Sequence, residues 1–238
     1  SSSTDHISAD VPGIHGTSHE FADLTDAEIF NAHQGGKIAT TSRLNLETIR
    51  DLSIAYTPGV ARVCEAIHED PSLAHHYTWA GRNVAIITDG TAVLGLGDIG
   101  PQAALPVMEG KAQLFQRFVG LNGVPIALDT TNVDEMFDTI CRIAPSFGAI
   151  NLEDISAPRC FELEKRLKNH LNIPVMHDDQ HGTAIISAAG LKNALEVAGK
   201  NIADVKLVVN GAGAAAISCT KLYMALGLKK ENIVMLDS

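Results

Sequence analysis

Residues 151–184 decide the fold of this chain, and they read NLEDISAPRCFELEKRLKNHLNIPVMHDDQHGTA. Two short apolar runs, residues 149–152 and 173–176, are typical of buried strands, and a helical segment separates them. Each run leads into a pair of carboxylates, which are Glu153 and Asp154 after the first run and Asp178 and Asp179 after the second. Open α/β sheets bind ligands at the carboxyl ends of their strands, so we expect both pairs at a ligand site.

The two acidic pairs are candidate metal ligands. Three or four converging carboxylate oxygens suit a hard divalent cation such as Mg²⁺ or Mn²⁺. The alternative is that these carboxylates are solvated loop charges and helix caps, and Asp179 could cap a helix that starts near Gly182. Either pair alone would favour that alternative, whereas two pairs at neighbouring strand ends favour a metal site.

Strands and helices alternate through the middle of the chain. The expected strands are residues 83–88, 125–129, 148–154 and 172–177. The expected helices are residues 25–33, 45–54, 60–67, 106–119, 135–143, 159–171 and a buried helix at 182–196. This alternation predicts an α/β fold with a mainly parallel sheet that is covered on both faces.

A glycine-rich stretch follows a further expected strand at residues 205–210. Its residues are Gly211, Ala212, Gly213, Ala214, Ala215 and Ala216, which match G-x-G-x-x-A. A helix and a strand follow, and Asp237 comes 24 residues after Gly213. In such units the glycines admit a pyrophosphate to the helix N-terminus and the acid binds the ribose, so the stretch predicts NAD or NADP binding. Asp237 favours NAD because its carboxylate would repel a 2′-phosphate, and a βαβ unit without a ligand is the alternative.

Residues 95–100 also match the dinucleotide pattern, but we interpret this match as a false one. Pro101 and Pro106 follow the glycines, so we expect the next helix to start only near Val107. The loop would instead allow close backbone approach beside a site.

These patterns predict two domains after an N-terminal leader. We expect a flexible leader at residues 1–24, a helical and parallel-sheet domain for substrate and metal at 25–177, and a doubly wound (Rossmann) dinucleotide-binding domain from 178 to 238. That second domain would be only partly present, because two strands and one crossover cannot bury their own faces.

Composition excludes several classes of protein. The net charge of −10 argues against a nucleic-acid-binding surface. The four cysteines are far apart and form no C-x-x-C motif, which favours a reducing cytoplasm. The sequence has no apolar run of membrane length and no secretory signal, so we expect no membrane association.

Five motifs together resemble malic enzyme, and the short bacterial form most closely. They are Tyr56-Thr57-Pro58-Gly59-Val60, Leu94-Gly95-Leu96-Gly97-Asp98-Ile99-Gly100, Val107-Met108-Glu109-Gly110-Lys111, Asn151-Leu152-Glu153-Asp154-Ile155 and His177-Asp178-Asp179-Gln180-His181-Gly182-Thr183-Ala184. They occur in the order found in the family, and the resemblance extends from about His33 to the last residue.

The resemblance implies a role for each matched residue. Tyr56 matches the family's general acid and Lys111 its general base, although in isolation the first is typical of a packing residue and the second of a solvated one. Glu153, Asp154 and Asp179 match the metal ligands, and Asp178 matches a neighbouring acid of the active site. Gly211, Gly213 and Ala216 match the phosphate-binding loop.

The implied reaction is the oxidative decarboxylation of L-malate to pyruvate and CO₂, with reduction of NAD⁺ or NADP⁺ and a requirement for Mg²⁺ or Mn²⁺. A homodimer is expected from the resemblance alone. Two departures stand out: Ala92 occupies the position of an arginine that holds a substrate carboxylate in larger members, and the family's C-terminal asparagines are absent. The alternatives are malolactic conversion of malate to lactate and a non-catalytic regulatory homologue that binds metal and nucleotide.

Overall fold

The computed structural model describes residues 24–237. The chain divides into two compact units, Ser1–Ala39 and Thr40–Ser238, and each is described by itself. The described part of the first unit contains helix α1 (Asp26–His33). Thr25 caps this helix, and its backbone N–H donates to Glu28 Oε2 (2.9 Å), so the predicted helix at 25–33 is confirmed. The predicted leader at 1–24 lies almost entirely outside the described residues.

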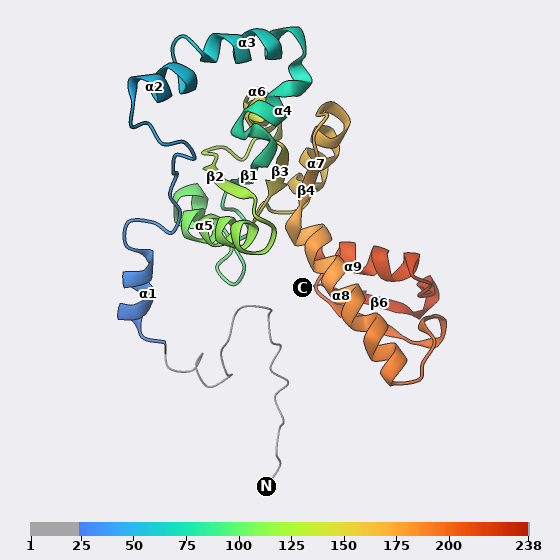
Figure 1. The fold of residues 1–238 in the computed structure, drawn as a ribbon. Helices are drawn as coiled ribbons and strands as arrows, with labels where there is room; N and C mark the ends of the chain where they lie inside the picture. Colours follow the sequence, from blue (N-terminus) through green and yellow to red (C-terminus); the bar gives the residue numbers. More distant parts are fainter. Residues whose placement is uncertain (1–23, 238) are drawn as a thin grey trace. The chain divides into compact units, whose positions relative to one another are not determined.

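A four-stranded parallel sheet forms the centre of the second unit (Figure 1). Its strands are β1 (Asn83–Thr88), β2 (Asn122–Ala127), β3 (Ala149–Leu152) and β4 (Val175–His177), in the order β2-β1-β3-β4. Every residue of β1 is buried, as expected for a central strand of a parallel sheet with both faces covered. The predicted parallel α/β architecture is therefore confirmed.

Helices cover both faces of this sheet. They are α5 (Gly100–Val119), α6 (Val133–Ile143), which continues into a short 3₁₀ turn η3 (Ala144–Ser146), and α7 (Arg159–His170). On one face Ile86 packs with Met108 and Ala112 of α5. On the other, Ile87 belongs to a larger core that includes Ile140 of α6 and Leu163 of α7. Successive residues of β1 thus anchor opposite layers, as the alternation of side chains along a strand requires.

The start of α5 differs from the expectation drawn from its prolines. The helix begins at Gly100, not near Val107, and Pro101 lies in its first turn, where a missing N–H costs nothing. Pro106 lies inside the helix. The close approach expected of the glycine loop is real, because the amide of Gly100 donates to the carbonyl oxygen of Gly90 (3.2 Å) and a Cβ on Gly90 would lie 2.1 Å from the Gly100 oxygen.

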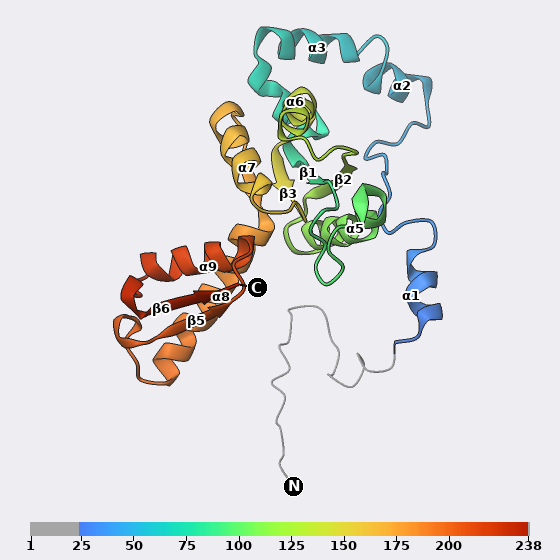
Figure 2. The same ribbon diagram turned by 180° about the vertical axis from the view of Figure 1, so that it is seen from behind.

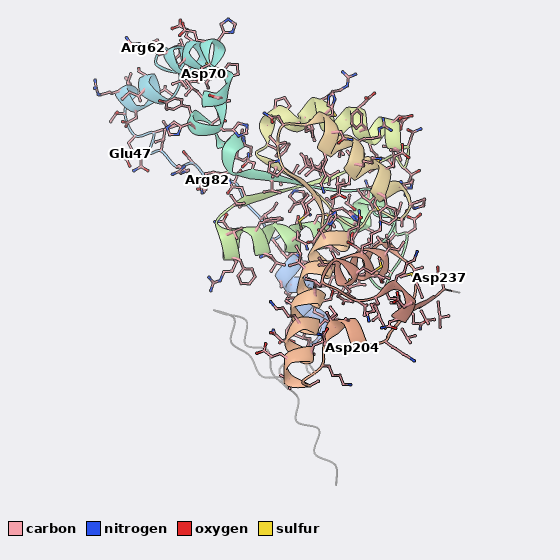
Figure 3. All side chains as sticks on the ribbon, turned by 90° about the vertical axis from the view of Figure 1, so that its right-hand side faces the viewer. Glu47, Arg62, Asp70, Arg82, Asp204 and Asp237 are labelled. Atoms are coloured by element: carbon pink, nitrogen blue, oxygen red, sulfur yellow. The ribbon has the colours of Figure 1, made fainter. Side chains whose placement is uncertain are left out.

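The segment before the sheet is helical. It contains α2 (Ile49–Ala55), α3 (Val60–Glu69), η1 (Pro71–Leu73), α4 (Ala74–Tyr77) and η2 (Trp79–Arg82). Helix α2 starts four residues later than predicted, because Thr48 caps it in a reciprocal pair with Asp51. Neither α2 nor α3 has a buried residue. Figure 3 labels Glu47, Arg62, Asp70 and Arg82 along this segment.

The last part of the unit contains a second, two-stranded parallel sheet (Figure 2). Its elements are α8 (Asp178–Val197), η4 (Ile202–Asp204), β5 (Leu207–Asn210), α9 (Ala214–Ala225), η5 (Lys230–Asn232) and β6 (Ile233–Leu236). Helices α8 and α9 pack against each other. The prediction that the helix around 182–196 is buried is wrong for much of its surface: Ile185 and Ile186 are exposed, because α9 covers only one face. Within residues 24–237, no helix combines the length and hydropathy needed to cross a bilayer.

Candidate active site

Both acidic pairs lie at the same edge of the four-stranded sheet. Leu152 of β3 is paired in register with His177 of β4, so the residues that follow these strands are neighbours. Glu153, Asp154 and Asp179 each direct a carboxylate oxygen to one place, and these oxygens all lie within 4.8 Å of one another. The backbone N–H of Asp154 also donates to Asp179 Oδ2 (2.9 Å). The structure therefore brings together the three residues expected to bind a metal.

The charges of this cluster are poorly balanced by protein groups. Burial, together with the charges of Asp178 and Asp179, raises the pKa of Glu153 to about 7, against the opposing effects of Lys111 and Asn151. Burial and then the charge of Asp179 raise the pKa of Asp154 to about 6. A group of carboxylates that resists ionisation in this way is stabilised by an added positive charge.

Asp154 is the least satisfied member of the cluster. Its Oδ2 is buried and has no hydrogen-bond partner. Its backbone is in the left-handed region (φ 54°), which few residues other than glycine adopt. A buried unpaired oxygen and an uncommon backbone conformation at the same residue indicate a functional constraint. The donor set, three carboxylates with one free oxygen, fits a hard divalent cation.

Lys111 contacts the cluster from a helix that precedes both acidic pairs in the sequence. It lies in the middle of α5, and its Nζ is 2.6 Å from Asp178 Oδ2 and 3.2 Å from Glu153 Oε1. Burial lowers the pKa of Lys111, but the hydrogen bond from Lys111 to Asp178 and the charges of both acids outweigh it, so the pKa is raised. The interpretation of Lys111 as a solvated surface lysine is therefore wrong, because its side chain is largely enclosed among acids.

His177 and Gly182 lie on either side of Asp178 and Asp179 at the start of α8. The helix begins at Asp178, so Asp179 lies in its first turn and does not cap it. His177 is fully buried, and its Nε2 is 3.1 Å from Asp179 Oδ2, although neither ring nitrogen makes a well-directed hydrogen bond. Gly182 leaves room for Asp178, whose Oδ1 would lie 2.1 Å from a Cβ at position 182.

The glycine-rich loop and Asp237 come together at one end of the second sheet. Gly211 follows β5 directly with φ 107°, and its N–H donates to the Leu236 carbonyl (2.7 Å). Helix α9 begins at Ala214 without a side-chain cap, and a Cβ on Gly211 or Gly213 would contact nothing within 4 Å. Asp237 follows β6 and is exposed at its end (Figure 3). Open glycines, a helix N-terminus with free N–H groups and an adjacent acid fit a dinucleotide pyrophosphate and ribose.

Comparison with known proteins identifies the family. The family model described as "Malic enzyme, N-terminal domain" matches residues 35–168, which is more than half of the chain. The chain belongs to the malic enzyme family. A curated NAD-dependent malic enzyme of Geobacillus stearothermophilus is 58% identical over 87% of this chain and 43% of its own length. A bifunctional malic/malolactic enzyme of Bacillus subtilis is 55% identical over 85% of this chain and 49% of its own length.

A solved malic enzyme supports the fold as well. The crystal structure of an NAD-dependent malic enzyme from Thermotoga maritima matches with a TM-score of 0.85 and 46% identity, over 90% of this chain and 56% of that chain. Other relatives are named NADP-dependent malic enzymes. The chain thus spans less than half the length of the two curated malic enzymes above.

One residue matched to the malic enzyme motifs is not brought to the cluster. Tyr56 follows α2, the residue is 66% exposed, and its hydroxyl makes no hydrogen bond within the described part of the chain. Its role as general acid therefore stays a prediction.

The sequence interpretation missed Arg159, which joins three loops beside the cluster. Its guanidinium donates to Asp89 Oδ2 (2.7 Å), the Thr131 carbonyl (2.9 Å), and the hydroxyls of Thr91 and Ser156 (both 2.9 Å). The loops after β1, β2 and β3 are tied together at this point. As the first residue of a predicted helix, Arg159 carries no sequence signal for contacts with residues 68 and 70 positions away.

The backbone of Ala92 contacts Asp154, one of the three clustered carboxylate residues. Its N–H donates to the carbonyl oxygen of Asp154 (3.0 Å). Asn151 was also missed: its amide donates to Glu153 Oε2 (2.8 Å) and so orients a predicted metal ligand.

Proposed function

We propose that the protein catalyses the oxidative decarboxylation of L-malate to pyruvate and CO₂, with reduction of NAD⁺ or NADP⁺ and a requirement for Mg²⁺ or Mn²⁺. The observation that carries this proposal is the contact of Lys111 with Asp178 and Glu153 at the three-carboxylate cluster. A proton-accepting amine beside a metal-binding carboxylate cluster suits the oxidation of a hydroxy acid. The names of the relatives, malic enzymes dependent on NAD or NADP, agree with it.

Each residue has a defined task in this proposal. Glu153, Asp154 and Asp179 would hold the cation, which when bound supplies a Lewis acid for the substrate's oxygens. Lys111 would accept the proton of the C2 hydroxyl as hydride leaves C2. Lys111 has to be neutral to accept this proton. Neutralisation of the Glu153 charge, as a bound cation would cause, would lower the pKa of Lys111, because Glu153 is one of the groups that raise it.

Asp178 and Tyr56 complete the proton chemistry. Asp178 accepts a hydrogen bond from Lys111 and would stabilise the lysine after it has taken the proton. Tyr56 would deliver a proton to C3 once CO₂ has left. The exposed position of Tyr56 means that additional structure has to enclose it before it can act in a water-excluded site.

We further propose NAD⁺ as the preferred cofactor and a cytoplasmic homodimer as the functional form. Asp237, at the end of β6, would repel the 2′-phosphate of NADP⁺. The four cysteines are all free thiols, which suits a reducing compartment. Exposed apolar side chains on α2, such as Ile49 (84% exposed) and Ile54 (62%), suit a surface covered by a second copy. Light scattering of the complete polypeptide would give a mass of two chains if the homodimer forms, and a mass of one chain would contradict it.

The test is an assay of the complete polypeptide with L-malate, Mn²⁺ and either NAD⁺ or NADP⁺. We expect cofactor reduction with stoichiometric pyruvate and CO₂, faster with NAD⁺. Lactate without net cofactor reduction would instead establish malolactic conversion, an outcome suggested by the name of the Bacillus subtilis relative. Neither product, from a folded protein that binds Mn²⁺, would favour a non-catalytic homologue.

A further inference from the structure

A buried carboxylate outside the cluster lies next to the turn that carries Asp178 and Asp179. Glu164 is on α7, and its side chain is only 8% exposed. Buried glutamates are uncommon unless they are paired, so its surroundings need an explanation. It belongs neither to the expected metal ligands nor to the expected proton-transfer groups.

Four donors converge on this carboxylate. The backbone N–H of His177 donates to Oε1 (3.1 Å), and the amide of Gln180 approaches Oε2 (3.4 Å). The Nε2 atom of His181 lies 2.8 Å from Oε1 and 2.9 Å from Oε2. Lys168, one turn further along α7, donates from Nζ to Oε1 (2.8 Å). Burial would raise the pKa of Glu164, but the hydrogen bonds from Lys168, His181 and His177 outweigh it and lower the pKa, so the group is ionised.

The donors bracket the two acids of the active site. His177 precedes Asp178 and Asp179 in the chain, and Gln180 and His181 follow them. Glu164 therefore holds the residues on both sides of Asp178 and Asp179. Of these two acids, Asp178 pairs with Lys111 and Asp179 belongs to the carboxylate cluster. Only an ionised carboxylate, which has acceptor sites and no donor, can serve all of these partners together.

We propose that Glu164 is a positioning residue that fixes the first turn of α8, and through it the placement of Asp178 and Asp179 at the metal site. Glu164 itself touches neither substrate nor cation. The inference rests on the proposed function, because it assumes that Asp179 is a metal ligand. Groups that orient the ligands of a metal from outside typically change its affinity by about 10-fold to 100-fold when they are replaced.

The test is the affinity of the complete polypeptide for Mn²⁺ alone, measured by electron paramagnetic resonance of the free ion, with Glu164→Gln as the main variant. The glutamine side chain has nearly the same shape as that of glutamate, but its NH₂ group places two donor hydrogens among groups that already donate. We expect the Kd for Mn²⁺ to rise about 10-fold or more. In the assay with malate, the activity should be restored by excess Mn²⁺, so that the KM for metal changes more than kcat.

Two matched controls lie on the same helix. Glu162→Gln changes an exposed carboxylate that pairs with Arg166, and Lys165→Ala removes an exposed positive charge that does not contact Glu164. Both should leave the Kd for Mn²⁺ within about twofold, since neither holds the α8 turn. If Glu164→Gln does not fold, His181→Ala replaces it, because His181 is a partly exposed donor on α8, and its Kd should also rise.

The outcomes separate the inference from the proposed function. Wild-type protein that binds no Mn²⁺ would overturn the metal site, and the proposed function with it. Wild-type binding together with an unchanged Kd in folded Glu164→Gln would overturn the positioning role alone. An equal rise of the Kd in Lys165→Ala would also contradict it, because a general charge effect would then explain the result.

Discussion

At the scale of single residues, the candidate site is a set of acids held together against their own repulsion. Glu153 and Asp154 are buried next to Asp178 and Asp179, and Lys111 is the basic side chain that forms an ion pair with Glu153 and Asp178. The spacing of the two pairs along the chain indicated that the carboxylates converge. It could not indicate Lys111, because the contact joins residues 67 positions apart and a lysine in a helix carries no local signal of burial.

The raised pKa values of these acids give a pH dependence of stability. In protein treated with a chelator, the free energy of unfolding should fall as the pH rises from about 4 to 7. The pKa of Glu153 is raised from 4.5 to about 7 and that of Asp154 from 3.8 to about 6 on folding. Within this window the folded state keeps protons that the unfolded state has released, so a higher pH favours unfolding, by an amount on the order of a few kcal/mol.

Urea unfolding at a series of pH values measures this slope. Glu153→Gln should flatten it, whereas Glu162→Gln, on the exposed surface of α7, should not. Mn²⁺ should reverse the trend, because a cation binds the ionised carboxylates and its affinity rises with pH. A stability that increases from pH 4 to 7 in the chelated protein would contradict the burial of these acids.

At the scale of elements, the sheet could be predicted better than the helix boundaries. Continuous apolar runs bounded by carboxylates predicted the parallel strands, because a strand buried on both faces has no polar alternation to obscure it. The start of α5 was predicted too late, since a proline that usually ends a helix is tolerated in its first turn. The exposure of α8 could not be predicted, because burial depends on which neighbours cover a helix and composition does not reveal them.

A substitution at Gly182 in α8 tests whether the first turn of this helix sets the position of Asp178. Gly182→Ala should lower kcat/KM by about 100-fold, because its Cβ would lie 2.1 Å from Asp178 Oδ1 and would displace that carboxylate from Lys111. Gly190→Ala is the matched control in the same helix, where a Cβ would meet nothing within 4 Å. We expect Gly190→Ala to keep its activity and to gain about 0.5–1 kcal/mol in unfolding free energy, because alanine favours the helix.

The measurements are kcat/KM with malate and urea denaturation of both variants. Equal activity of Gly182→Ala and Gly190→Ala would show that the placement of Asp178 is not needed for the reaction.

At the scale of the whole molecule, the chain spans less than half the length of the two curated relatives compared with it. The three carboxylates proposed to bind a metal, Lys111 and the glycine-rich loop all lie within this length. Tyr56 is exposed, and Ala92 offers no side chain for a substrate carboxylate. The sequence alone could connect Tyr56 with Lys111 only through family resemblance, because the two residues share no element and no described contact.

The most direct test of the account is the malate oxidation rate of Lys111→Ala, measured in the complete polypeptide with saturating Mn²⁺ and NAD⁺, and compared with Lys165→Ala on the exposed surface of α7. We predict that kcat falls by about 100-fold to 10,000-fold in Lys111→Ala, the usual contribution of a general base, and that it is unchanged in Lys165→Ala. An unchanged kcat in folded Lys111→Ala would contradict the role of this lysine and, with it, the proposed active site.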